Sequence, residues 1–496
     1  MNRTTSTLSL NEPLIFERSA PGKAAYQLPE LDIKDTPLQE ILDSKYLRDE
    51  ISGFPEVSEV ELIQHYVRMS TWNYHIDLGI YPLGSCTMKY NPKLNERVAR
   101  IPNIANTHPL QGDALSQGNL EILFRLQTCL KELTGMSDIS LQPAGGAQGE
   151  LTGILMVRAH HLSQNNPRKY VLIPDSAHGT NPASATIAGY DVISIPSDSQ
   201  GRISIEALAD KMTEDVACLM LTNPNTLGIF EKNIADISKI VHGKGGLIYM
   251  DGANFNALLG YARPGDMGID VLHLNLHKTF STPHGGGGPG SGPVACQKIL
   301  EPYLPIPRIE KQDETYLLNE KKSMSVGRVH AFYGNFGMIV RALCYILTCG
   351  GKGLKELSET AVLNANYIRH QLKDYYDLPF DTPTLHEVIF SDTVQAKNGI
   401  KTLDIAKRLL DYGFHPPTIY FPLIIHGALM IEPAESVGKD ELDAFIQTMI
   451  TISKEAEETP EKILNAPQNV RLTRLNETQA ARSPILKWTD PEQVND

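Results

Sequence analysis

A single lysine stands just after an apolar segment and before a run of small residues. Residues 270–274 have the character of a β-strand, Lys278 follows them, and residues 285–290 carry almost no side-chain bulk. A lysine amine can form an imine with an aldehyde, and glycines let the backbone approach a flat ligand closely. Lys278 is therefore a candidate for covalent attachment of pyridoxal phosphate (PLP).

Two other interpretations of this stretch compete with PLP attachment. Lys278 could be a solvated loop lysine beside a flexible glycine hinge, or His273 and His277 could ligate a metal ion. Neither explains Asp251, which ends another apolar segment at residues 247–250. A carboxylate there can pair with the protonated pyridine nitrogen of PLP and keep the ring electron-withdrawing. The presence of Asp251 together with Lys278 favours PLP.

A glycine-rich turn marks the predicted phosphate site. Residues 144–149 read Ala-Gly-Gly-Ala-Gln-Gly, and they open a segment whose apolar residues recur at helical spacing. The exposed N–H groups of a helix N-terminus bind anions, and the helix dipole helps them. We expect Gly146, Ala147 and Gln148 to contact the phosphate.

Two more predicted strands end in polar residues. His178 follows the strand that ends near residue 174 and could stack on the ring face. Loop 221–228 could bond the ring hydroxyl, where Thr226 is favoured over Asn225. At this point the ordinary interpretations stay open, namely a surface turn at His178 and a turn built by Asn and Pro in the loop.

Strands and helices alternate over the central part of the chain. Candidate strands occupy residues 138–142, 169–174, 191–196, 216–222, 247–251, 270–274 and 292–296. Such alternation predicts an α/β fold with a mainly parallel seven-stranded sheet that is covered on both faces. In sheets of this kind ligands gather at the carboxyl ends of the strands. The candidate residues follow those ends.

Four parts are expected along the chain. Residues 1–75 form an N-terminal arm with helices, 76–330 a large PLP-binding domain, 331–455 a smaller α+β domain, and 456–496 a C-terminal tail. The 496 residues carry a net charge of −13, which argues against nucleic acid or an anionic membrane as partner. Six cysteines without paired spacing indicate reduced thiols and no zinc site. The N-terminus lacks the apolar core of a secretory signal, so we expect a cytoplasmic protein.

Several motifs closely resemble the PLP-binding P-protein of the glycine cleavage system, glycine dehydrogenase (decarboxylating). They lie at residues 83–89, 277–290, 332–337, 414–418, 431–436 and 480–488. The resemblance covers essentially the whole chain and is to subunit 2, the lysine-bearing half of the two-subunit form. It implies PLP-dependent fold type I, as in aspartate aminotransferase.

The resemblance also implies a reaction and partners. The chain would decarboxylate glycine, release CO₂ and transfer the aminomethyl group to the lipoyl arm of H-protein. It would do so with the homologous subunit 1, in a heterotetramer with two copies of each subunit. Catalytic roles would fall to Lys278, His178 and Asp251. Ala253 and His277 would join the cofactor contacts, and Ser85, Thr87 and Lys89 would bind the substrate carboxylate, with no metal site.

The sequence departs from the family pattern at one position, and two other functions compete with the P-protein assignment. Gly145 stands where many members of the family have serine, which removes one side-chain contact to the phosphate. Another enzyme of fold type I, such as an amino-acid decarboxylase, a transaminase or a cysteine desulfurase, would share Asp251 and Lys278. A non-catalytic scaffold subunit would be expected to lack the lysine.

Overall fold

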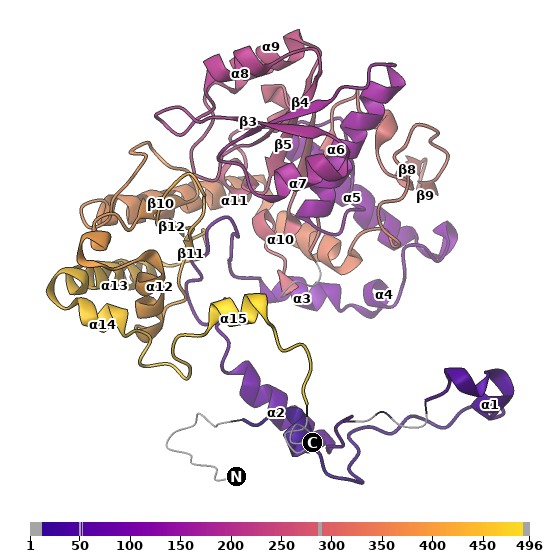
Figure 1. Ribbon diagram of the computed structural model, residues 1–496. Coiled ribbons are helices and arrows are strands. Elements are labelled where there is room, and N and C mark those ends of the chain that lie inside the picture. The colour runs from indigo at the N-terminus through magenta and orange to yellow at the C-terminus, as the bar shows by residue number, and fades with distance from the viewer. Residues whose placement is uncertain (1–11, 49–50, 52, 286–289, 490–496) are drawn as a thin grey trace. The chain divides into compact units, whose positions relative to one another are not determined.

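The chain folds into two compact units. The computed structural model describes residues 12–48, 51, 53–285 and 290–489. One unit combines the chain up to His75 with the C-terminal segment from Leu475, and the other spans Ile76–Arg474 (Figure 1).

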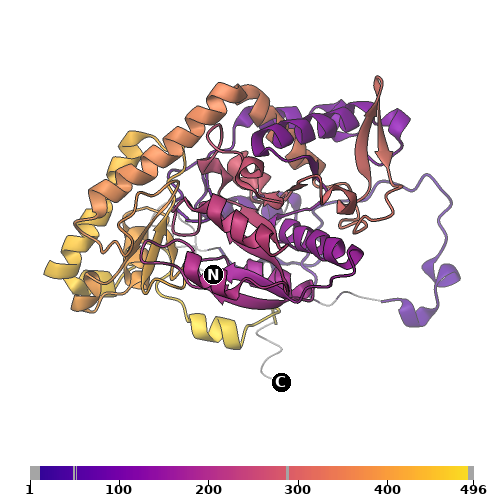
Figure 2. The same cartoon turned by 90° about the horizontal axis from the view of Figure 1, so that it is seen from above.

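A seven-stranded sheet forms the centre of the second unit (Figure 2). Its spatial order is β1 (Asp138–Ser140), β7 (Val294–Cys296), β6 (Val271–Leu274), β5 (Leu247–Gly252), β4 (Val216–Thr222), β2 (Tyr170–Pro174) and β3 (Asp191–Ile195). The strands from β6 to β3 pair in parallel, and β7 pairs antiparallel to both of its neighbours. The predicted α/β fold is confirmed, and all seven strands lie close to their predicted bounds.

Helices cover both faces of this sheet. Every residue of β4 is buried, as expected for a strand inside a parallel sheet. On one face the core contains residues of α5 (Gln117–Thr134), α8 (Ile205–Lys211) and α9 (Ile234–Gly243). On the other face it contains residues of α6 (Gly146–Ser163) and α7 (Thr180–Ile187). Toward the end of β4 successive side chains alternate between the two cores, with Leu219 and Leu221 in one and Met220 in the other, because neighbouring side chains of a strand face opposite sides of the sheet.

A smaller sheet lies elsewhere in the same unit. Its order is β10 (Val388–Ser391), β12 (Ala428–Ile431) and β11 (Thr418–Ile419), all antiparallel. A separate core joins it to α12 (Thr402–Asp411), α13 (Lys439–Glu458) and α14 (Pro460–Leu464). The long α11 (Phe336–Leu372) contributes to this core and to one core of the large sheet, with a non-helical residue at Gly350. The division at residue 330 stays a prediction, because both sheets belong to one compact unit.

Shorter elements complete the second unit. The hairpin β8 (Arg308–Gln312) and β9 (Thr315–Asn319) precedes α11, and helices α3 (Lys93–Ala99) and α4 (Pro102–Ala105) precede α5. A four-residue helix, α10 (Leu276–Thr279), follows β6 and carries Lys278. Because β5 and β6 are parallel neighbours, Asp251 and α10 lie at the same edge of the sheet.

The first unit contains short helices and a buried ionic cluster. It includes α1 (Leu38–Ile41), α2 (Glu59–Ser70) and α15 (Glu477–Arg482), and α2 begins with a capping box of Ser58 and Glu61. Arg18 lies 2.6 Å from the carboxylate of Glu12, and the hydrogen bond from Arg68 lowers the pKa of Glu12 to about 2. Among the described residues of both units, no helix has the length and apolar character needed to cross a membrane.

Candidate active site

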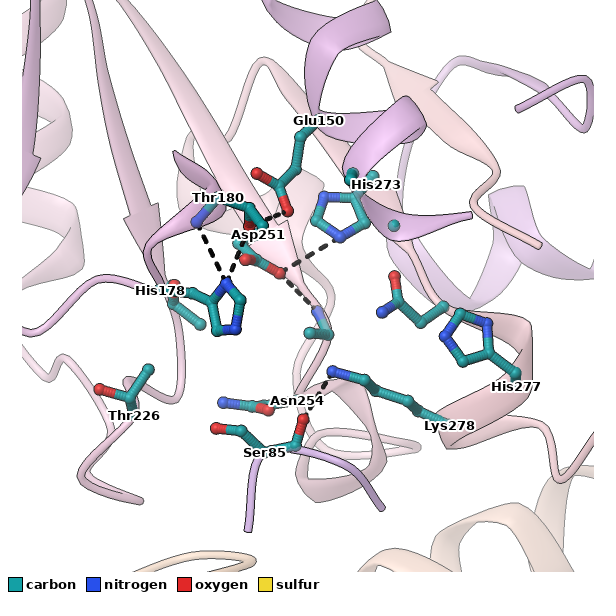
Figure 3. Close-up of a pocket in the computed structure, with 15 residues that line it drawn as sticks. Ser85, Glu150, His178, Thr180, Thr226, Asp251, Asn254, His273, His277 and Lys278 are labelled. Carbon is teal, nitrogen blue, oxygen red and sulfur yellow. Dashed lines mark hydrogen bonds and ion pairs between the residues drawn. The ribbon is translucent and has the colours of Figure 1, made fainter. Parts of the chain in front are cut away.

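A cavity of about 240 Å³ opens at the carboxyl ends of the large sheet's parallel strands (Figure 3). Most of the residues singled out from the sequence line it, although they come from distant parts of the chain. The lining residues are Ser85, Gly146, Ala147, Glu150, His178, Thr180, Thr222, Thr226, Asp251, Ala253, Asn254, His273, Asn275, His277 and Lys278.

Lys278 presents its amine to this cavity (Figure 3). The side chain is half-buried, and Nζ donates a hydrogen bond of 2.7 Å to the carbonyl oxygen of Ser85. The short helix α10 positions it directly after β6. The amine is therefore held by one backbone acceptor and remains beside open space, as a nucleophilic lysine requires.

Asp251 lies at the end of β5 and is 3 % exposed. Its Oδ1 accepts a hydrogen bond of 2.9 Å from the backbone N–H of Ala253, and its Oδ2 accepts one of 3.2 Å from Asn181 Nδ2. Burial opposes ionisation, yet interaction with His273 and Lys278 lowers the pKa of Asp251 below its usual value. The buried carboxylate is charged, and it can hold a proton-bearing ring nitrogen opposite it.

His273 supports Asp251 from the neighbouring strand. The two residues are register partners of β5 and β6, and His273 Nε2 lies 3.3 Å from Asp251 Oδ1. The other ring nitrogen, Nδ1, lies 2.6 Å from the Tyr249 hydroxyl. Both nitrogens of His273 therefore have protein partners among the described residues. The only sign of this role in the sequence is a histidine inside an apolar strand.

The first turn of α6 forms one end of the cavity. Gly149 donates the first backbone bond of this helix, 2.9 Å to the oxygen of Gly145, so the N–H groups before it are left for a ligand. Gly146 and Ala147 line the cavity, but Gln148 does not. The Gln148 side chain accepts a 2.6 Å hydrogen bond from the N–H of Ala144 and donates one to the oxygen of Val329. Only its backbone N–H remains as a phosphate contact.

His178 and Thr226 line the opposite side. His178 Nδ1 lies 2.8 Å from the hydroxyl of Thr180, which in turn donates a 2.8 Å hydrogen bond to Glu150. Thr226 also lines the cavity, and its hydroxyl donates to the carbonyl oxygen of Ser176. The sequence patterns indicate neither Glu150, which lies within α6, nor Thr180, which is the first residue of α7.

Of the three residues expected to bind substrate in the segment at residues 83–89, only Ser85 lines the cavity. Ser85 lines the cavity with a buried hydroxyl that has no hydrogen-bond partner in the described part of the chain, and its φ of 56° is unusual for serine. Thr87 is fully buried, and its hydroxyl donates a 2.6 Å hydrogen bond to Glu432. Lys89 is buried too, where its amine pairs with Glu435 and donates to the oxygen of Thr279. Thr87 and Lys89 thus have structural partners and do not reach the cavity.

His277 lies beside Lys278 on α10 and lines the cavity. Its Nδ1 accepts a 3.3 Å hydrogen bond from the N–H of Ser291. Burial, with the nearby charges of His284 and Lys278, lowers the pKa of His277 to about 3, so the ring is neutral. Most of the glycine-rich run that follows, residues 286–289, lies outside the described residues.

Sequence families identify the relationship. A family model described as "Glycine cleavage system P-protein" matches residues 35–309, and one described as "Glycine dehydrogenase, C-terminal domain" matches residues 357–473. The chain belongs to the glycine cleavage system P-protein family. The resemblance seen in the sequence motifs is thereby confirmed.

Curated relatives in this family match over nearly their whole length. One from Caldanaerobacter subterraneus subsp. tengcongensis is 54% identical over 477 residues, which are 96% of this chain and 98% of the relative. One from Bacillus licheniformis is 55% identical over 479 residues, covering 96% and 99%. Both are named "Probable glycine dehydrogenase (decarboxylating) subunit 2".

Solved structures agree on the fold. An inhibitor-bound glycine decarboxylase (P-protein) of the glycine cleavage system matches with a TM-score of 0.72 at 19% identity, covering 84% of this chain and 94% of that one. A NifS-like protein matches with a TM-score of 0.59 at 16% identity, covering 76% and 99%. The expected PLP-dependent fold type I is confirmed.

The cavity of this P-protein family member fits PLP. Four of its buried polar atoms have no partner among the described residues, and they are Ser85 Oγ, Thr222 Oγ1, Asn254 Oδ1 and Asn275 Oδ1. Buried polar groups are normally hydrogen-bonded, so these atoms indicate a polar ligand. The helix N-terminus is suited to bind the phosphate of PLP. Asp251 is suited to pair with the ring nitrogen, and Lys278 to form an imine with the aldehyde.

Proposed function

We propose that this chain is the PLP-bearing, lysine-containing subunit of a glycine-decarboxylating enzyme. It would release CO₂ from glycine and pass the aminomethyl group to the lipoyl arm of H-protein. The observation that carries the proposal is the meeting of Lys278, Asp251 and the α6 N-terminus in one cavity of a P-protein family member. When bound, PLP supplies an electron sink for the pair of electrons that the departing carboxyl group leaves behind.

The residues of this chain divide the work of holding the cofactor and substrate. Lys278 would bind the cofactor covalently and hold a proton at Nζ. Asp251 would keep a proton on the ring nitrogen, because its carboxylate is buried and charged. The N–H groups of Gly146 and Ala147 would bind the phosphate. The neutral ring of His277 and the backbone at Ala253 would complete the cofactor contacts, with His178 over the ring face and Thr226 near the ring hydroxyl.

Ser85 is the proposed substrate contact. Its hydroxyl lies in the cavity without a hydrogen-bond partner from the residues that the structure describes, and its carbonyl oxygen accepts a hydrogen bond from the Lys278 amine. A donor at this place would bind the glycine carboxylate and orient the bond that breaks. Thr87 and Lys89 would act indirectly, by fixing the loop that presents Ser85.

The proposal includes two protein partners. Relatives named as subunit 2 support a homologous subunit 1, and the P-protein family supports H-protein as the carrier of the lipoyl group. Two copies of each subunit and a cytoplasmic location stay predictions. The rival of a scaffold subunit is disfavoured, because this chain keeps both Lys278 and Asp251 at the cavity.

Exchange of labelled bicarbonate into glycine tests the proposed reaction. The assay contains PLP, lipoylated H-protein and subunit 1, and it compares the wild type with Lys278→Ala. Lys298→Ala is the matched control, since Lys298 is exposed and does not line the cavity. We expect exchange with the wild type and the control and none with Lys278→Ala. A wild-type chain that binds PLP but exchanges no label would overturn the proposal.

A further inference from the structure

Glu150 is a buried carboxylate beside the cavity for which the proposed function has no role. It lies in α6 after the phosphate-binding turn and is 4 % exposed. Three donors surround it: Thr180 Oγ1 at 2.8 Å, Asn181 Nδ2 at 3.0 Å and Ser184 Oγ at 3.4 Å. Figure 3 shows its carboxylate beside Thr180 and above Asp251. By accepting hydrogen bonds, the Glu150 carboxylate determines where the hydrogen atoms of these three donors point.

The hydrogens around Glu150 can be assigned. Asn181 Nδ2 also lies 3.2 Å from Asp251, so its two N–H groups go to two carboxylates. The reversed amide would turn its oxygen toward both carboxylates and repel them. Because donors surround it, the Glu150 carboxylate acts as a hydrogen-bond acceptor toward all three. The single hydroxyl hydrogen of Thr180 must therefore point to Glu150.

This assignment fixes the hydrogen on His178. The Thr180 oxygen has given its hydrogen to Glu150 and lies 2.8 Å from His178 Nδ1, so Nδ1 must carry a hydrogen to make this bond. In the other tautomer, Nδ1 would instead accept a hydrogen bond of 3.2 Å from the backbone N–H of Thr180. That tautomer would set two lone pairs against each other at the shorter contact. The other nitrogen, Nε2, faces the middle of the cavity in Figure 3.

We infer that Glu150, acting through Thr180, is a positioning residue that holds His178 as its Nδ1–H tautomer and leaves Nε2 as a proton acceptor in the cavity. This inference rests on the proposed function for its chemical use. Glycine arrives as an ammonium ion and must lose a proton before its nitrogen can act as a nucleophile. Transfer of that proton to Nε2 leaves a neutral amine and an imidazolium ion, whose charge Glu150 balances through Thr180.

The tautomer can be measured on the full chain without cofactor. The ¹⁵N shifts of a histidine-labelled sample distinguish the two tautomers, and loss of signal in His178→Gln assigns the residue. We expect the Nδ1–H form in the wild type and in Thr180→Ser, and a shift toward the Nε2–H form in Thr180→Val and Glu150→Gln. Thr186→Val on the same helix is the control, since Thr186 is exposed and its hydroxyl donates to the carbonyl oxygen of Pro182. An Nε2–H tautomer in the wild type would overturn the inference.

Activity provides the second readout. In the exchange assay, Thr180→Val and Glu150→Gln should lower kcat/KM for glycine by roughly tenfold to hundredfold, less than loss of a whole acid–base group. Thr180→Ser should restore most of it, and PLP absorbance should be unchanged in all variants. Full activity in a variant whose tautomer has shifted would refute the proposed use of Nε2. If the wild type shows no exchange, the proposed function fails, and the tautomer measurement still decides the role of Glu150.

Discussion

Asp251 shows how single residues set the chemistry of the cavity. A buried carboxylate alone would resist ionisation, but His273, held in turn by Tyr249, lies against it and favours its charge. Lys278 faces the same space from the next strand end. The charges that PLP chemistry needs are therefore arranged by neighbouring strands rather than by flexible loops.

His277 should make the folded chain sensitive to acid. The pKa of His277 is about 3 in the folded state, mainly through burial, and near 6.5 in the unfolded state. Between these two pH values the unfolded chain binds a proton at this histidine and the folded chain does not. The stabilisation is complete above the unfolded value and is lost as pH falls toward 3. For this one group the unfolding free energy should fall by about 2 kcal/mol between pH 7 and pH 5.

Urea unfolding at a series of pH values measures this effect. The slope of unfolding free energy against pH should become shallower in His277→Gln. The exposed His370 on α11 provides the control, and His370→Gln should keep the wild-type slope. An unchanged slope in His277→Gln would contradict a buried, neutral imidazole at this position.

At the same scale, sequence reasoning succeeded where residue type and strand end coincide. Asp251 and Lys278 end apolar runs, so they could be expected at the edge of a sheet. The burial of Thr87 and Lys89 away from the cavity could not be predicted, because their partners Glu432 and Glu435 lie in a remote part of the chain. Glu150 gave no signal, since a single acid in a helix usually faces solvent.

The contact of α6 with β6 and β7 positions the phosphate-binding turn at the scale of elements. A Cβ at Gly149 would lie 2.7 Å from the oxygen of Gly292 and 2.9 Å from His273 Cβ. Glycine is therefore needed there for close approach of helix and strands. Gly149→Ala should destabilise the chain by roughly 1–3 kcal/mol through overpacking. It should also weaken PLP binding, because the helix N-terminus is displaced.

Urea unfolding and PLP titration check both parts of this prediction. Gly118→Ala is the control, because nothing lies within 4 Å of a Cβ at that helical position. Alanine there should leave stability unchanged or raise it slightly. Equal stability and PLP affinity in Gly149→Ala and the wild type would contradict close packing between α6 and the sheet at this position.

The large sheet was predictable and the close packing was not. Apolar runs of strand length, separated by helical patterns, mark all seven strands through local burial alone. The antiparallel direction of β7 and the contact of Gly149 with Gly292 depend on residues far apart in sequence. Neither feature can be predicted from a local sequence pattern.

At the scale of the whole molecule, the cavity belongs to one compact unit. All its lining residues lie between Ser85 and Lys278, and all the described hydrophobic cores lie within residues 76–474. A chain restricted to these residues should fold cooperatively and bind PLP. Its binding free energy should differ from that of the full chain by less than about 0.7 kcal/mol, a threefold change in Kd.

Calorimetry and PLP titration of the 76–474 fragment test this independence. A single cooperative unfolding transition is expected, together with PLP affinity close to that of the full chain. A fragment that does not unfold cooperatively, or that binds PLP far more weakly, would show that the first unit helps to build the site.

The central claim is that Lys278 holds PLP, and borohydride reduction of the PLP-loaded full chain tests it most directly. Reduction makes the linkage permanent, and mass spectrometry of the digested chain locates it. We expect the mass of the reduced pyridoxyl phosphate group on the peptide that contains Lys278, and on no other lysine at comparable yield. Stoichiometric label on a different lysine, or none on Lys278 when PLP is bound, would contradict the account.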